Sequence, residues 1–224
     1  MNDTNSNGKL VAGIIIALII GVGGGYSVSN AISNNKSNVA NVMPTTDTKS
    51  ADLRVLLNGL EREHVSLASQ ATRNGFSGNA DFDASAKALD NNSVELSKAI
   101  GSIYGTDAQA KFLAIWRSHI GFFVDYTVAA KSGDKAGMDK AVQNLGGYID
   151  AISDFFSGAN PNLPREAVKQ LITDHVGLLK AAVDTYGAND FAASYAKEHE
   201  ADQQIGTIAN TISGAIVKQY PEKF

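Results

Sequence analysis

Residues 112–127 read FLAIWRSHIGFFVDYT, and their large apolar side chains recur every three or four positions. This spacing is the period of an α-helix with one buried face, so the stretch predicts a core helix. A histidine within such an aromatic stripe needs explaining, because a buried polar group without a hydrogen-bond partner costs about 1–3 kcal/mol. The predicted stripe comprises Phe112, Trp116, His119, Phe123 and Tyr126.

The same period continues from Ser50 to the C-terminus, and no segment alternates with a period of two residues. Glycines that follow the stripes are typical helix stops, and Ser, Thr, Asn and Asp residues that precede them are typical N-caps. The connections are short, which favours antiparallel neighbours. We therefore expect an all-α fold, a six-helix antiparallel bundle with helices near residues 51–74, 80–104, 106–131, 134–157, 164–186 and 189–219. The predicted stops are Gly75, Gly105, Gly133, Gly158 and Gly187.

The stripes also predict which residues form the core, because one face of each helix must be buried. The predicted core comprises Leu53, Leu57, Leu60, Leu67, Leu89, Leu96, Ile100, Phe112, Trp116, Phe123, Leu145, Ile149, Ile152, Phe156, Leu171, Leu179, Ile205 and Ile212.

Three of the four histidines recur at regular intervals, in the phrases GLEREHVSL, IWRSHIGFF and LITDHVGLL. His64, His119 and His175 lie 55 and 56 residues apart. This interval equals two helices and two turns, so it predicts a bundle built from three helical-hairpin repeats, 51–104, 106–157 and 164–219. The fourth histidine, His199, lies on the return helix of the third hairpin.

The helical period places all four imidazoles on inward faces, with Asp202 beside His199. Imidazole ligates zinc, copper, iron and nickel, and helical bundles often build metal sites from facing helices. We therefore hypothesise a transition-metal site (copper, zinc or iron) with the ligands His64, His119, His175, His199 and Asp202. Other acids close to these histidines, as ligands or orienting partners, are Glu63, Asp174, Glu198 and Glu200.

Two alternatives stay open for these histidines. They could be structural residues that form hydrogen bonds across each hairpin, or they could bind haem or another ligand. The sequence has no His-x3-His motif, and no Glu-x2-His pair recurs in two helices as ferritin-like oxidation chemistry requires. There is also no phosphate loop, nucleophile elbow or cysteine, so no catalytic residue is assigned and a metal-dependent oxidoreductase is the least supported function.

The N-terminal segment predicts the location of the protein. Residues 10–28 form an uncharged run close to the roughly 20 residues that span a bilayer as a helix. We expect a cytoplasmic N-terminus at 1–9, a transmembrane signal-anchor at 10–28, a flexible linker rich in Asn, Ser and Thr at 29–50, and an extracytoplasmic helical domain at 51–224. Ser29-Asn30-Ala31 would instead suit a signal peptidase, and cleavage there would give a secreted protein.

Composition limits the partners. The chain has 224 residues, a formal net charge of -4 and no cysteine. This balance gives no reason to expect nucleic acid, which requires a clustered basic patch, and the lack of cysteine excludes disulfides and thiolate metal ligands. The expected partners are the membrane, through the N-terminal helix, and an extracellular ligand or protein; the oligomeric state stays open.

Four phrases resemble a known type of domain: ALDNNSVELSKAIGSIYG (88–105), FLAIWRSHIGFFVDYT (112–127), GANPNLP (158–164) and GAIVKQYPEKF (214–224). They are similar to an exported, all-helical bacterial domain over roughly residues 52–224. Some of its relatives are labelled copper amine oxidase-like, after a separate oxidase domain that this sequence lacks. The resemblance implies an exported helical domain, no established activity and a slight preference for copper.

These observations favour one function over its alternatives. We expect a membrane-anchored extracytoplasmic helical binding or interaction module at the cell surface, which binds a transition metal if the histidines are ligands. The alternative is a purely structural surface domain with core histidines.

Overall fold

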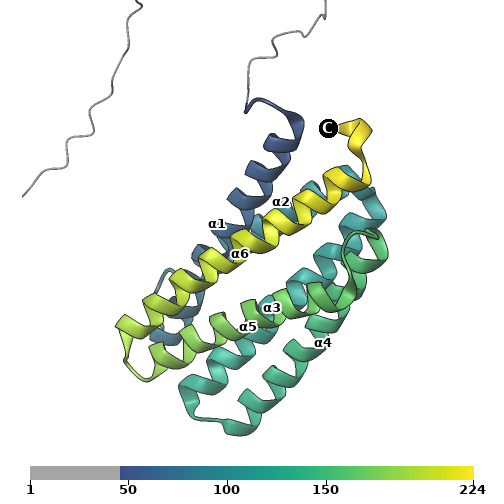
Figure 1. Cartoon of the computed structure of the whole chain (residues 1–224). Coiled ribbons are helices and arrows are strands. Elements are labelled where there is room, and N and C mark those ends of the chain that lie inside the picture. Colours follow the sequence, from purple (N-terminus) through teal and green to yellow (C-terminus); the bar gives the residue numbers. More distant parts are fainter. Residues whose placement is uncertain (1–45) are drawn as a thin grey trace, which may run out of the picture. The chain divides into compact units, whose positions relative to one another are not determined.

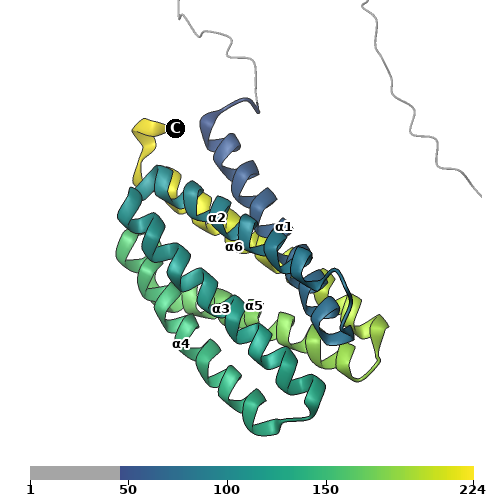
Figure 2. The same cartoon turned by 180° about the vertical axis from the view of Figure 1, so that it is seen from behind.

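The helical period is borne out in a computed structural model that describes residues 46–224 (Figures 1 and 2). This part of the chain contains α-helices and a short 3-10 turn and no strand, as predicted. Each predicted helix agrees with an observed one to within three residues at either end. The elements are α1 (Lys49–Ser77), α2 (Phe82–Tyr104), α3 (Thr106–Ser132), α4 (Lys135–Ala159), α5 (Arg165–Gly187), α6 (Phe191–Gln219) and η1 (Pro221–Lys223).

Short polar side chains begin three of the helices. Thr48 accepts a hydrogen bond from a backbone N–H in the first turn of α1, and Asp134 and Asp190 do the same for α4 and α6. These caps satisfy N–H groups that have no partner within the helix. At the other end, α1 and α3 stop at Gly78 and Gly133, whose φ angles of 73° and 71° are left-handed and suit glycine.

Two of the predicted stops are wrong, because the glycines concerned lie inside helices. Helix α1 continues through Gly75, and a Cβ atom there would lie only 2.9 Å from Cε2 of Phe82. The role of Gly75 is thus to let the Phe82 ring approach the helix. Helix α4 likewise continues past Gly158 and ends before Asn160, a buried residue whose side chain bonds to the Tyr104 hydroxyl and to the backbone of Asn162.

The helices pack as three consecutive hairpins, α1 with α2, α3 with α4 and α5 with α6. Neighbouring hairpins also contact each other, α2 with α3 and α4 with α5, while α6 returns to lie along α1 (Figures 1 and 2). Consecutive helices run in opposite directions. In consequence α1, α3 and α5, which carry the three regularly spaced histidines, run in the same direction.

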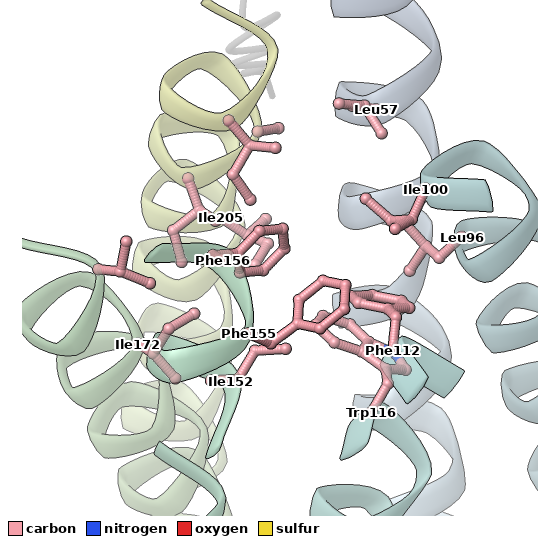
Figure 3. Packing of buried hydrophobic residues seen from close by; sticks show 14 of the residues in the cluster. Leu57, Leu96, Ile100, Phe112, Trp116, Ile152, Phe155, Phe156, Ile172 and Ile205 are labelled. Carbon is pink, nitrogen blue, oxygen red and sulfur yellow. The ribbon is translucent and has the colours of Figure 1, made fainter. Parts of the chain in front are cut away.

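One main hydrophobic core fills the bundle. Near its middle the rings of Phe112, Phe155 and Phe156 meet, with centroids of Phe112 and Phe155 5.8 Å apart (Figure 3). Fifteen of the eighteen predicted core residues are buried. The exceptions, Leu67, Phe123 and Leu171, are half-buried.

The described residues belong to one compact unit that extends to Phe224. Its buried core lies wholly within residues 53–216, so the unit meets the physical requirement for folding by itself. None of its helices combines the length and the apolar character needed to cross a bilayer. The predicted signal-anchor at 10–28 lies outside the described residues, as does most of the predicted linker at 29–50.

Candidate functional site

His64 of α1 and His119 of α3 meet in the core. Their Nε2 atoms lie 3.4 Å apart, and the two side chains are 1% and 4% exposed. Both histidines occupy the core stripes of their helices, which is why α1 and α3 bring the rings together. Sequence spacing correctly predicts that both rings face inward, but their contact depends on how the helices pack.

Aromatic rings surround the pair. The ring of Trp116 lies 4.9 Å from that of His64 and 4.7 Å from that of His119, centroid to centroid. The ring of Tyr148, from α4, lies 4.5 Å from that of His119. Among the described residues, Nδ1 of His64, Nδ1 of His119 and Nε1 of Trp116 are buried without a hydrogen-bond partner. Such unpaired buried atoms are rare in folded proteins and call for an explanation.

His175 of α5 is the third buried histidine, and its hydrogen bonds define its tautomer. Gln204 of α6 donates through Nε2 to the carbonyl of Leu171, at 2.7 Å, so its Oε1 is left to accept. That oxygen lies 3.0 Å from Nδ1 of His175, which must therefore carry the proton. Nε2 of His175 is then a lone pair, and it too has no partner within residues 46–224.

Burial keeps these imidazoles uncharged. Desolvation, with a contribution from His175, lowers the pKa of His64 to about 3. Desolvation and the neighbouring His64 and His175 hold the pKa of His119 well below its usual range, although the backbone of Trp116 partly opposes this. Desolvation also lowers the pKa of His175 to about 4. At neutral pH all three present lone pairs, which is the form that binds metal ions.

A buried acid that sequence reasoning missed lies one turn before His64. Glu61 is 4% exposed, its Oε2 has no partner in the described part of the chain, and desolvation raises its pKa to about 8. Burial raises the pKa of Tyr148 well above its usual range, and the nearby Glu61 adds to this shift. The signal was present in the sequence, since Glu61 and His64 have the Glu-x2-His spacing that places both on one helical face. Nothing in the sequence pointed to Tyr148 or Gln204.

The prediction that His199 faces inward is wrong. The buried residues of α6 include Ser194, Ala201, Ile205 and Ile208, and His199 lies about 200° around the helix from Ala201. It is therefore exposed. The other predicted ligand on this helix, Asp202, forms an ion pair with Arg62.

The other acids named as possible metal ligands or orienting partners form hydrogen bonds or ion pairs, or are exposed to solvent. Glu63 accepts a hydrogen bond from Asn92, and Glu198 forms an ion pair with Arg73. Asp174 is exposed and Glu200 pairs with a lysine on its own helix. Across the residues that the structure describes, no set of three or more His, Asp or Glu side chains is positioned to hold a metal ion. The closest approach to such a site is the pair of His64 and His119.

These two histidines also line a pocket of about 360 Å³ between α1, α2, α3 and α5. Comparison with known proteins adds no assignment: no family model matches this chain, and neither the curated proteins nor the solved structures include a significant match.

Proposed function

We propose that the helical domain is a binding module displayed on the outer side of the cell membrane, and that the buried pair His64–His119 is its site for a first-row transition metal ion. The Nε2–Nε2 separation of 3.4 Å is the observation that carries this proposal. Two nitrogen ligands at 2.0–2.1 Å from one ion and at this separation subtend an angle of about 110°, which is tetrahedral. The two rings therefore need little movement to share an ion.

The protonation states of the two imidazoles also support a metal site at this pair. Ligand imidazoles must be neutral, and burial keeps both rings neutral down to acidic pH. Ligand histidines normally donate their second N–H to a fixed partner, as His175 does to Gln204. His175 is thus the candidate for a third ligand, after a side-chain rearrangement. Glu61, one turn from His64, is the candidate acid.

Zinc, copper, iron and nickel all suit imidazole ligands. A tetrahedral angle is typical of zinc, whereas the sequence resemblance favours copper. The pair supplies two ligands, and water or His175 would complete the coordination. This arrangement fits a protein that takes up, carries or senses a metal ion better than it fits a particular reaction.

Trp116 provides a direct assay, because it is the only tryptophan in the sequence and contacts both rings. Cu(II) quenches the fluorescence of nearby tryptophan. Titration of the untagged, chelator-treated protein with Cu(II) should therefore quench Trp116 with a one-to-one endpoint. Bound Zn(II), which does not quench, should block this change, and elemental analysis after dialysis should find one ion per chain.

Two variants distinguish metal binding at the buried pair from metal binding at a surface histidine. His119→Gln should abolish quenching and metal retention, whereas the matched control His199→Gln should behave like the wild type because His199 is exposed. Circular dichroism and cooperative urea unfolding establish that each variant is folded. Retention of no metal by folded wild-type protein would mean that the pair is a structural contact, in which one Nε2–H donates to the other ring.

The membrane location is proposed from residues 10–28. The full chain should remain in the membrane fraction after a carbonate wash, and the helical domain should be accessible to protease from outside intact cells. N-terminal sequencing of the mature protein distinguishes this anchor from a signal peptide cleaved after Ala31.

A further inference from the structure

The pocket beside the imidazole pair is lined by the C-terminal halves of α1, α3 and α5. Its wall is mainly apolar and includes Leu89, Phe123 and Leu179, together with His64 and His119. An apolar cavity of about 150 Å³ in a protein core can remain dry and bind benzene. This pocket is more than twice as large, at about 360 Å³.

The lining of the pocket offers no free charge to a ligand, although Lys131 at its edge donates to the carbonyl of Gly75 at 3.3 Å. Among the described residues that line the pocket, Arg73 alone is charged, and its guanidinium is paired with Glu198 and lies over the ring of Tyr195.

The lining hydroxyls of Thr127, Tyr186 and Ser194 have partners, whereas those of Ser69 and Thr72 form no hydrogen bond within the described residues. Thr127 donates to a backbone carbonyl of α3 at 2.8 Å, and Ser194 donates to one of α5 at 2.9 Å.

Besides the hydroxyls of Ser69 and Thr72, the two histidines of the lining have unused hydrogen-bonding capacity. Nδ1 of His64 and Nδ1 of His119 have no partner among residues 46–224. When two neutral rings share one hydrogen bond through Nε2, one of them keeps an Nδ1–H and the other keeps an Nδ1 lone pair. The pair therefore has one unused donor and one unused acceptor, but both Nδ1 atoms are buried and do not face the open space of the pocket.

The pocket also has a route to solvent. Val124 and Val128 of α3 belong to its lining, yet their side chains are 43% and 63% exposed. An apolar rim of this kind favours the entry of apolar molecules, because it loses less hydration than a charged rim.

We propose that this pocket binds one neutral, largely apolar molecule of about ten to twenty non-hydrogen atoms that carries a single hydroxyl or similar polar group. The apolar body fills the space between α1, α2, α3 and α5, and the polar group bonds to the lining hydroxyls of Ser69 and Thr72. A carboxylate of the same length binds less well, since no lining residue offers a free cation to its charge. This inference does not depend on metal binding.

Binding is measured on the compact unit starting at Pro44, in EDTA, with N-phenyl-1-naphthylamine as the probe. Its fluorescence should rise and saturate at one molecule per chain. 1-Decanol should displace it, and decanoate should do so about a hundredfold less well because of its charge. Equal displacement by the two compounds, or the absence of saturable binding, would overturn the proposal.

Two variants that fill the pocket from different helices test its location. Ala68 of α1 and Ala86 of α2 line the pocket, whereas Ala84 of α2 is exposed and does not. Ala68→Leu and Ala86→Leu should each weaken probe binding about tenfold, because the added side chain occupies the space of the ligand. The matched control Ala84→Leu should leave binding unchanged. Unaltered binding by both filling variants, shown to be folded by circular dichroism, would refute the assigned site.

Discussion

Replacement of Glu61 by Gln should make the protein more stable at pH 7, because it removes an ionisable group from a buried position. Glu61 is 4% exposed and its Oε2 has no partner within the described residues, so its environment resists the charged form. Burial raises the pKa from 4.5 to about 8. At pH 7 the carboxyl is therefore protonated in the folded protein and ionised in the unfolded chain.

This difference determines the sign and the size of the effect. The folded state holds a proton that the unfolded state releases between pH 4.5 and 8, so the contribution of Glu61 is complete below pH 4.5 and is lost as the pH rises through 8. Each pH unit in this interval corresponds to about 1.4 kcal/mol. At pH 7 the deficit is about 3 kcal/mol, and Glu61→Gln, which is neutral in both states, should recover it.

Comparing the urea unfolding of the wild type and Glu61→Gln from pH 6.5 to 8 isolates this group, because the histidines contribute equally to both proteins. Relative to Glu61→Gln, the free energy of unfolding of the wild type should fall by about 2 kcal/mol across this range. The neighbouring, exposed Glu63 supplies the control, since Glu63→Gln should retain the wild-type slope. If Glu61→Gln is less stable than the wild type at pH 7, Glu61 is ionised in the fold and the argument from burial is incorrect.

Three further changes test the core and the site. His175→Gln should reduce acid sensitivity in urea unfolding between pH 7 and 4.5. The pKa of His175 is lowered to about 4, so wild-type stability is lost as the pH falls below 6.5, by about 2.5 kcal/mol at pH 4.5. Ile152→Ala, at a fully buried position, should lower the free energy of unfolding by about 2–5 kcal/mol; a loss below about 1 kcal/mol would contradict the packing of Figure 3. Asn160→Ala should cost about 1–3 kcal/mol, visible as a lower Tm in calorimetry, because the buried amide joins Tyr104 to the turn after α4.

The fold was largely predictable because helical structure depends on local pattern. Apolar spacing, N-caps and turn residues act over a few positions, and they gave helix ends within three residues of those observed. Where a predicted helix end was wrong, a contact with another helix determined where the helix ends. Gly75 was assigned as a stop, but the Phe82 ring packs against it and α1 continues to Ser77.

The candidate site was predictable only in part. The period of α1, α3 and α5 placed His64, His119 and His175 inward, and all three are buried. The same reasoning fails for His199, which it places on the core face of α6 although the early turns of that helix bury Ser194 and Ala201 instead. When a helix carries few large apolar residues, its sequence predicts only weakly which face is buried.

The sequence alone therefore determined the helices, their order and the inward direction of three imidazoles, since each follows from the 3.6-residue period. Only the tertiary structure decided that His64 and His119 touch and that Gln204 holds His175 in one tautomer. It also decided that Oε2 of Glu61 is buried without a partner among the described residues. The physical reason is that burial, tautomer and pKa depend on the neighbours that packing brings from other helices, and a helical period contains no information about those neighbours.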